Sequence, residues 1–550
     1  MMRLLRTVRY LRLRQIIYRL VRRGPLRRIA WRVGGSPWVR FRRGMEALGN
    51  GAPPPAFRPI LFACAPDPPG LIDSSGLRVD GVAAPGSPDE WSTGSSPFRV
   101  YRLHAQLFAA HSASDREHVW RLILRYLTSL ERDPDAWHTH PLSLRLIHWV
   151  RFLSADDDKR ESRPAVILAM RLQARFLLRH IEWETDGNHL IDNAAALVVA
   201  GVALADPDMA RRGRRLLLRE ATRQLLPNQT HEERSPMYHR LVTERLLDAV
   251  SALRGFPDDA GFSDSSGQLC GLAQRYLAGS ELWERRDAAL NDTFPGMGPS
   301  HAALVAYARE MGLGEHLAEK TATKPHPDEF MLHARGSVRV LFDTAPIGAR
   351  HVAGHAHADS LQLLVWSEGR PVVVDTASSS YDGDSVRDYE RSTRAHNTVG
   401  LHRNGSLLDS SELWGVFRVG RRASVTERRI VEDTPQRWIA TAAHDGYREF
   451  GLTHRRTVHL DDHGLQIRDE LVGRDQPNGV VVWILSPDIR PEPMNAPTLF
   501  RCGPVVIELQ DVDHVEVRMV HVATGYAART GAYALHGFFR SSSQTLFRPR

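Results

Sequence analysis

Residues 355–376 read HAHADSLQLLVWSEGRPVVVDT, and this stretch marks the change from a helical to a β-rich half of the chain. It contains an apolar segment, a Gly-Arg-Pro turn and a second β-branched run, which is the pattern of two paired strands. His355 and His357 occupy alternate positions and therefore share one face, while Ala356 points away. Asp375 ends the second run, where the turn returns the chain toward His357. The stretch predicts a hairpin with its polar residues gathered at one end.

The segments on either side of this hairpin differ in their periodicity. Between residues 100 and 320, apolar residues recur at helical spacing, as in PLSLRLIHWVRFLS, RPAVILAMRLQARFLLRHIEWE, DNAAALVVAGVALA and LVTERLLDAVSALR. After TKPHPDEF (323–330) the runs become short and alternating, as in RRTVHLDDHGLQIRDEL and GVVVWILS. The junctions DDHG (461–464) and DVDH (511–514) are typical of hairpins. A helical domain is therefore expected before an antiparallel β domain, with a natural site in the cleft between them.

Length and linker composition suggest further divisions. A chain of 550 residues exceeds one compact core. Residues 50–98 are rich in Pro, Gly and Ser and read as an irregular connector. We predict a multidomain α+β protein with a basic amphipathic segment, a connector, a helical domain and an antiparallel β domain, at 1–45, 46–98, 99–325 and 326–550.

Cysteine usage and hydropathy exclude several classes of protein. Cys64, Cys270 and Cys502 are far apart and form no CxxC pair, which argues against a disulfide scaffold or a thiolate zinc cluster. The chain has no apolar run of about 18 residues, so no membrane span is expected. A metal site would have to use histidines and carboxylates.

The basic residues concentrate at the start of the chain. Residues 1–43 hold fourteen arginines and no acidic residue, which leaves 58 basic against 64 acidic residues in the remainder. Interleaved apolar residues make this segment an amphipathic helix rather than a cleavable secretory signal. It fits an anionic membrane surface, nucleic acid, or docking on the acidic body, and docking is favoured. The acidic body argues against nucleic-acid binding. We expect a cytoplasmic or inner-membrane location, with the periplasm open.

The histidine pair was compared with chemistries that use an HxH motif. The metallo-β-lactamase pattern HxHxDH fails, because Ser360 stands where the last histidine is required. An amidohydrolase barrel fails on context, because its HxH ends the first strand of an alternating β/α chain. A zinc constellation of His357, Asp375 and His396 remains, since imidazole and carboxylate are normal zinc donors. Hydrogen-bonded turn residues are the alternative.

Four stretches in order resemble the heparinase II/III-like polysaccharide lyases. The run HAHADSLQLLVWSEGRPVVVDTASSSY with DYERSTRAHNTV matches the family pattern H-x-H-x-D, G-[RK]-P, hydrophobic-D and R-S-T-x-x-H-N-T. DGNHLIDNAAAL (186–197), HEERSPMYHRLV (231–242) and HDGYREFGLTHRRTVHL (444–460) agree in the same order. The resemblance implies an incomplete (α/α) toroid followed by layered antiparallel β-sheets in a β-sandwich.

The resemblance also implies β-elimination of a uronic-acid-containing polysaccharide, an anionic substrate. In this reaction a neutraliser stabilises the charge on the carboxyl group, a base takes the C5 proton and an acid protonates the departing O4. Asn188 matches the neutraliser, and Tyr238 matches the tyrosine that protonates O4 and, for syn geometry, also removes the proton. His189 matches the base for the opposite epimer, and His355 the residue that assists neutralisation or polarises the tyrosine. The sequence does not choose between the two bases.

Further roles follow from the same resemblance. His357, Asp375 and His396 resemble the ligands of a structural zinc under the cleft. Positions expected to bind substrate lie within the matched motifs: Glu233, Arg240, Tyr381 and Arg391. A homodimer is compatible with the sequence.

The chain departs from the family pattern at two places, and two rival functions are open. LPNQTHEERSPMYH carries Asn228 and Gln229 where many members have an acidic residue and glycines, which puts the substrate in doubt. The basic segment in place of a secretion signal favours a role in bacterial surface or exopolysaccharide metabolism. One rival is a glycoside hydrolase, which requires two carboxylates flanking the bond. The other is a non-catalytic polysaccharide-binding protein. Candidate hydrolase carboxylates are Glu182, Glu184, Asp186, Glu232 and Glu233.

Overall fold

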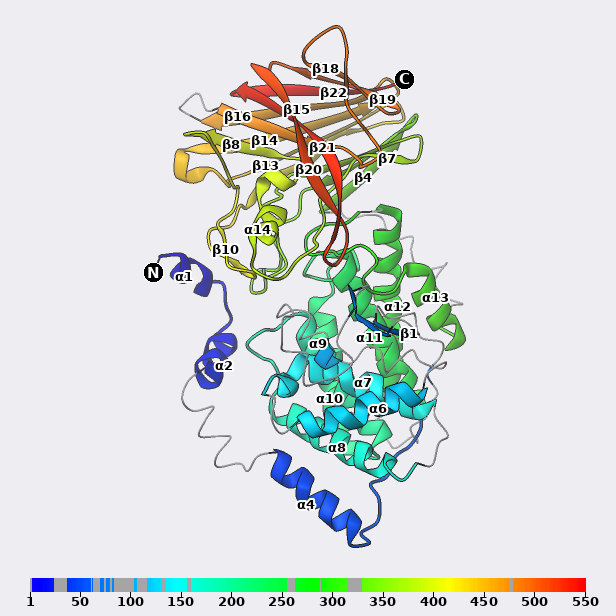
Figure 1. The fold of residues 1–550 in the computed structure, drawn as a ribbon. Coiled ribbons are helices and arrows are strands. Elements are labelled where there is room, and N and C mark those ends of the chain that lie inside the picture. Colours follow the sequence, from blue (N-terminus) through cyan, green and yellow to red (C-terminus); the bar gives the residue numbers. More distant parts are fainter. Residues whose placement is uncertain are drawn as a thin grey trace.

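The structure is a computed structural model that describes residues 2–23, 37–60, 62, 70–73, 76–79, 82–83, 103–105, 116–130, 134–155, 160–254, 263–286, 288–313, 329–473 and 478–550. These residues form a helical domain and a β domain stacked end to end (Figure 1). This arrangement confirms the predicted order of an incomplete helical toroid followed by antiparallel sheets. In the described ranges, no helix is long and apolar enough to span a bilayer.

The helical domain is organised around α9 (Asn188–Ala203), which is buried along nearly its whole length. From Ala194 to Ala203 its sequence AAALVVAGVA is apolar on every side, as expected of a central helix. Gly201 lets α10 approach closely, because a Cβ at this position would lie 2.5 Å from the Ala210 nitrogen. The surrounding helices are α6 (Arg116–Ser129), α7 (Thr139–Ser154), α8 (Arg163–Arg179), α10 (Pro207–Gln224), α11 (Pro236–Arg254), α12 (Ser263–Arg286) and α13 (His301–Glu310).

The β domain contains three main antiparallel sheets. The eight-stranded sheet has the order β12-β13-β14-β15-β22-β19-β18-β17, the five-stranded sheet β20-β21-β16-β8-β9, and the four-stranded sheet β4-β5-β6-β7. Their bounds are β4 Phe330–Arg335, β5 Val338–Asp343, β6 Leu363–Ser367, β7 Arg370–Val373, β8 Val399–Arg403, β9 Ser406–Leu408, β12 Val425–Asp433, β13 Arg437–His444, β14 Leu452–Asp461, β15 Gly464–Gly473, β16 Asn478–Ile484, β17 Glu492–Pro493, β18 Leu499–Cys502, β19 Val505–Gln510, β20 His514–Gly525, β21 Ala528–Arg540 and β22 Ser542–Pro549.

Strand alternation explains how these sheets pack. Along β14, buried and half-buried positions alternate without interruption, which is the pattern of a strand with one face on the core. One apolar cluster includes Val340 and Val365 from the four-stranded sheet, Trp483 from the five-stranded sheet, and Ile467 and Phe547 from the eight-stranded sheet. The three sheets therefore share a core, as the layered architecture requires.

Two of the three predicted hairpins are confirmed. β6 and β7 pair across Glu368 and Gly369, and β14 pairs with β15 with Asp461 opposite Gly464. The hairpin predicted at DVDH is wrong, because β19 belongs to the eight-stranded sheet and β20 to the five-stranded sheet. Residues 511–514 are a crossover between the sheets. Local turn chemistry does not distinguish these two uses of a polar turn.

The N-terminal part of the structure differs from the prediction, which was one basic helix followed by an irregular connector. It forms α1 (Met2–Val8), α2 (Leu13–Arg23) and α4 (Pro37–Gly49), and the small antiparallel sheet β1 (Gly70–Asp73), β2 (Gly76–Val79) and β3 (Val82–Ala83). Residues 24–36 of the basic segment and most of residues 84–115 lie outside the described ranges. The four predicted domain ranges stay predictions at their boundaries.

Two segments join the domains at the position of the expected cleft. Residues 288–300 leave α12 and run against the β domain, where the Ser378 nitrogen donates to the Thr293 carbonyl at 3.0 Å. The β20–β21 hairpin descends toward the helical domain (Figure 1), and the Ala527 nitrogen at its tip donates to the Ser379 carbonyl at 2.8 Å. Three polypeptide segments therefore meet between the helices and the sheets: residues 288–300, residues 378–379 and the tip of the β20–β21 hairpin.

Candidate active site

The beginning of α9 places Asn188 and His189 at the junction. Asp186 and Gly187 both have left-handed φ values, 66° and 58°, and this turn sets the direction in which α9 begins at Asn188. His189 Nδ1 lies 3.1 Å from Glu182 Oε2, and the His189 ring stacks on His140. Burial opposes the charged ring, but the Glu182 carboxylate prevails and raises the pKa of His189.

Glu233 connects this helix start to the β domain. Its Oε1 accepts from the Asn188 nitrogen at 2.9 Å, and its Oε2 lies 3.8 Å from His355 Nε2. Oε2 is buried and has no hydrogen-bond partner among the described residues. Burial raises the pKa of Glu233. The side chain is therefore held more readily in the protonated state than an exposed glutamate.

The first turns of α11 place Tyr238 against two residues of the β domain. The Tyr238 hydroxyl lies 3.0 Å from the Tyr381 hydroxyl, which in turn lies 3.3 Å from His355 Nδ1. The rings of Tyr238 and His355 have centroids 4.1 Å apart. Burial, aided by the negative charge of Asp292, raises the pKa of Tyr238 well above that of an exposed tyrosine. Tyr238 therefore carries its proton at neutral pH.

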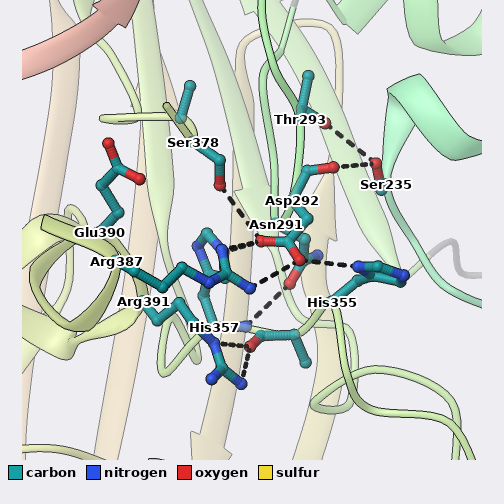
Figure 2. A network of polar contacts seen from close by, with 12 residues as sticks. Ser235, Asn291, Asp292, Thr293, His355, His357, Ser378, Arg387, Glu390 and Arg391 are labelled. Carbon is teal, nitrogen blue, oxygen red and sulfur yellow. Dashed lines mark hydrogen bonds and ion pairs between the residues drawn. The ribbon is translucent and has the colours of Figure 1, made fainter. Parts of the chain in front are cut away.

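Asp292 is the centre of the polar network (Figure 2). Its Oδ2 accepts from His355 Nδ1 and Arg387 Nη2, both at 2.8 Å, and its Oδ1 accepts from His357 Nε2 at 2.9 Å and from Ser378 Oγ at 3.2 Å. Arg387 Nη1 also donates to Oδ1. Burial opposes the charge, yet Arg387 and the two histidines hold the pKa of Asp292 well below its usual range. A buried carboxylate thus fixes the orientation of His355.

Sequence reasoning missed Asp292. It lies in NDTFPGMG, beyond the last long helix and 63 residues before His355, where no hydrophobic periodicity operates. Its only local signal is an Asn-Asp pair in a loop otherwise rich in Gly and Pro. Asn291 serves the same junction, since its side chain accepts from the His357 nitrogen at 3.2 Å and donates to the Arg234 carbonyl at 3.1 Å.

The expected substrate-binding residues lie in different surroundings. Glu233 and Tyr381 belong to the cluster described above. Arg391 is buried and directs its guanidinium at the backbone carbonyls of Ala356 and of residues 415 and 416, so it supports the chain beside His355. Arg240 lies farther along α11, with Nη1 3.8 Å from Glu284 Oε2. Glu233 and Tyr381 therefore lie within the cluster, whereas Arg391 supports the backbone beside it.

The three expected metal ligands lie near one another below this cluster. The rings of His357 and His396 have centroids 5.2 Å apart, and His396 Nδ1 lies 3.0 Å from Asp375 Oδ2. His357 Nδ1 and His396 Nε2 are buried and lack hydrogen-bond partners in the described structure. These two nitrogens fit zinc in their chemistry, because neutral imidazole nitrogens left unpaired are its normal donors. Within the described ranges, however, no three His, Cys, Asp or Glu side chains converge as a metal centre.

Comparison with known protein families identifies two matching regions. Residues 329–529 match the model of the heparinase II/III-like C-terminal domain. Residues 128–262 match the model of the heparinase II/III N-terminus. Together these regions cover the helical domain around α9 and most of the β domain. A search of curated proteins finds no match.

Solved structures share the same architecture. A crystal structure of heparinase III superposes with a TM-score of 0.62 at 14% sequence identity, covering 87% of this chain and 82% of that chain. The heparan sulfate lyase HepC from Pedobacter heparinus superposes with a TM-score of 0.54 at 17% identity, covering 87% of this chain and 80% of that chain. At these identities the likeness concerns the fold.

Proposed function

This chain belongs to the heparinase II/III-like family, and we propose that it is a polysaccharide lyase that cleaves a uronic-acid-containing polysaccharide by β-elimination. The observation that carries the proposal is a continuous chain of contacts across the domain junction. It runs from Asn188 through Glu233 to His355, and from His355 through Tyr381 to Tyr238. An amide, a carboxyl group, an imidazole and a phenol are thereby gathered at the junction of the two domains.

The start of α9 is suited to neutralising the substrate carboxylate. The Asn188 amide donates a hydrogen bond without adding negative charge, and the N-terminus of a helix carries a partial positive charge. A protonated Glu233 extends this role, because its unpartnered Oε2 can then donate to the same carboxylate. Lowering the negative charge on the carboxyl group makes the C5 proton more acidic, which is the difficult requirement of the reaction.

Tyr238 is suited to protonating the departing O4. Its raised pKa keeps the proton on the phenol until an alkoxide develops beside it. The Tyr381 hydroxyl and His355 form a relay behind Tyr238, and Asp292 fixes the tautomer and orientation of His355. His355 is thereby positioned to polarise the tyrosine or to help hold the substrate carboxylate.

The base depends on the epimer at C5. For syn elimination Tyr238 would have to lose its own proton before it takes the C5 proton, and its raised pKa opposes this. For the opposite face His189 takes the proton. His189 must first be neutral, and the Glu182 carboxylate opposes this by raising its pKa. Proton abstraction by His189 is therefore favoured at alkaline pH.

A zinc ion would have a structural role below the cleft. His357 Nδ1 and His396 Nε2 are the nitrogens that would hold it, with Asp375, which bonds to the other ring nitrogen of His396, as the predicted third ligand. The ion would link the segments that precede β6 and β8. His355 and His357 both lie in the segment that leads to the β6–β7 hairpin, and both contact Asp292. A bound ion would therefore also limit movement of His355. The proposed chemistry needs no contact between the ion and the substrate.

The glycoside hydrolase alternative is weakened because most of its candidate carboxylates form ion pairs. The pKa of Glu182 is lowered to about 2, because the His189 and His140 charges outweigh burial. Arg223 contacts both Asp186 and Glu232. Such ionised groups are poor general acids. Burial raises the pKa of Glu233, which suits a general acid, but a hydrolase also needs a free ionised carboxylate across the bond, and Glu182, Asp186 and Glu232 are held in contacts with histidine or arginine.

We propose that the substrate is a bacterial surface polysaccharide or exopolysaccharide. The proposal rests on the family match and on the structural similarity to heparinase III and to the heparan sulfate lyase HepC. Contact of the basic segment with an anionic membrane, and a homodimeric state, stay predictions.

The test is the ultraviolet absorbance of the conjugated C4=C5 uronate, which forms only by elimination. Purified protein is incubated with heparan sulfate, alginate, hyaluronan, chondroitin and bacterial uronans. We expect a rise in absorbance with one polymer, abolished in Tyr238→Phe and retained in Tyr533→Phe, a matched substitution on β21. New reducing ends without ultraviolet absorbance would establish hydrolysis and refute the proposal. Binding of a polymer with neither product would establish a non-catalytic role.

A further inference from the structure

The described N-terminal residues 2–23, here called the strap, run along both domains (Figure 1). At the β domain, Arg3 and Arg6 contact Glu412 at 3.1 and 3.2 Å, and Arg6 also contacts Glu449 at 3.0 Å. The Trp414 indole donates to the Thr7 hydroxyl at 3.0 Å. The first helix of the strap is thus held by charges and hydrogen bonds of the β domain.

The second helix of the strap docks at the beginning of α9. Arg14 Nη2 lies 2.7 Å and Arg12 Nη1 3.4 Å from Asp186 Oδ2. Gln15 is fully buried, and its amide donates to the Thr185 carbonyl at 3.5 Å and the His351 carbonyl at 3.4 Å. One glutamine therefore touches the turn before α9 and the segment that leads to His355.

Polar contacts rather than apolar burial hold α2 in place. Leu13, Ile17 and Leu20 of this helix are exposed by 73%, 48% and 70%. Arg14 and Arg19 face the protein: Arg19 donates to the Glu184 carbonyl, and Arg14 also stacks over the Trp183 ring at 5.1 Å. This orientation is the reverse of a helix that docks through its apolar stripe. The arginines at positions 12 and 14 therefore have a specific task at the surface they cover.

That surface is the strained turn that sets the start of α9. Asp186 has φ 66°, which lies in the left-handed region that favours glycine. Its Oδ1 accepts from the Gly187 nitrogen at 2.9 Å and from Arg223 Nη2 at 2.6 Å, while Oδ2 faces Arg14. Hydrogen bonds and charges from His351, Arg223 and Arg14 outweigh burial and hold the pKa of Asp186 below its usual range. The turn keeps its shape because its carboxylate stays ionised and bonded on both oxygens.

We propose that Arg14 is a positioning residue of the active site, which acts through Asp186 to fix the Asn188 and His189 end of α9. Arg12 and Gln15 complete the contact, and the strap thereby makes the geometry of the helical side of the cleft depend on a segment anchored to the β domain. The expected effect on kcat rests on the proposed lyase function. The expected effect on the turn before α9 rests on the contacts alone.

The test compares Arg14→Gln, which removes the charge, with Arg14→Lys, which keeps it, and with Arg42→Gln on exposed α4 as the matched control. We expect kcat of Arg14→Gln to fall at least about tenfold with KM changed less than about threefold, because Asn188 acts in the transition state. Arg14→Lys should recover much of the loss, and Arg42→Gln should equal the wild type. Asp186→Asn should lower kcat similarly, and the double variant should be no worse than either single variant.

Amide hydrogen exchange tests the same contact without substrate. Exchange at residues 187–190 should accelerate several-fold in Arg14→Gln and stay unchanged in Arg42→Gln. Unchanged exchange in Arg14→Gln would overturn the proposal, as would wild-type kcat in Arg14→Gln or additive losses in the double variant. If the wild type eliminates no polymer, the lyase function fails while the exchange experiment still decides the role of Arg14.

Discussion

Replacing Asp292 by asparagine probes the centre of the site. The substitution keeps the size of the side chain and removes its negative charge, while Arg387 stays fully buried beside it. His355 and His357 then face an amide in place of a carboxylate. Two effects are expected: a loss of stability from the unpaired guanidinium, and a loss of rate from a wrongly oriented His355.

The magnitudes follow from the geometry. Removing one partner of a buried ion pair costs about 3–5 kcal/mol, because the other charge is left desolvated. The rate loss should be about 10²–10⁴ in kcat, the range for a group that supports general acid–base catalysis. Because the pKa of Asp292 lies below its usual range, its contribution to stability is complete at neutral pH and is lost only as the medium becomes acidic enough to protonate it.

A matched control separates the two effects. Asp469 is also buried and accepts from one arginine and one histidine, with Arg456 Nε and His454 Nε2 both at 2.7 Å. Asp469→Asn should lose comparable stability in denaturant unfolding and keep the kcat of the folded protein. Adding Arg387→Gln to Asp292→Asn should recover about 1–3 kcal/mol of stability but no activity. Wild-type kcat in folded Asp292→Asn would refute the positioning of His355 by this carboxylate.

Three further outcomes are expected. Glu182→Gln should lower the pKa of the His189 ring, which NMR measures. With a substrate for which His189 is the base, the acidic limb of the kcat/KM profile should move to lower pH. An unchanged pKa of the ring would contradict the pairing of His189 with Glu182. Chelation should lower the Tm of the wild type by about 2–4 °C per kcal/mol of zinc binding lost, and it should leave the Tm of His396→Gln unchanged. A wild-type Tm that is the same with and without the chelator would contradict a bound zinc. Burial lowers the pKa of His536 to about 4, so the unfolded state binds the proton first and up to about 3 kcal/mol of stability should be lost between pH 6.5 and 4. His536→Gln should show a shallower decline by denaturant unfolding, and an unchanged slope would refute the assignment.

The order of the domains could be predicted from sequence because it depends on local periodicity. Helical spacing in 141–154 and 241–254 corresponds to α7 and α11, and the alternation around 452–473 corresponds to β14 and β15. The partnership of β6 with β7 follows from a two-residue turn, where Gly369 has φ 75°. The hairpin predicted at DVDH was wrong because the choice between a hairpin and a crossover depends on which sheet the next strand joins.

The site could be predicted only as far as its motifs reach. Asn188, Tyr238, His355 and Glu233 lie in three recognisable stretches, and the fold brings these stretches together. Asp292 could not be predicted, because its partners are 63 to 95 residues away and its role depends on burial that no local pattern reveals. The strap was open to several interpretations for the same reason, since arginine spacing does not specify which acidic surface it will meet.

Two of the proposed catalytic side chains, Tyr238 and His355, are each oriented by a residue from the other side of the domain junction. Tyr238, on a helix, meets Tyr381 of the β domain, while His355 of the β domain is fixed by Asp292 from the segment that leaves α12. The turn before Asn188 is held by a strap whose first helix is anchored at Glu412. No single domain therefore contains a complete site. Substitutions that loosen the junction should reduce kcat without touching substrate, and the rate of elimination becomes a direct measure of how well the two domains are held together.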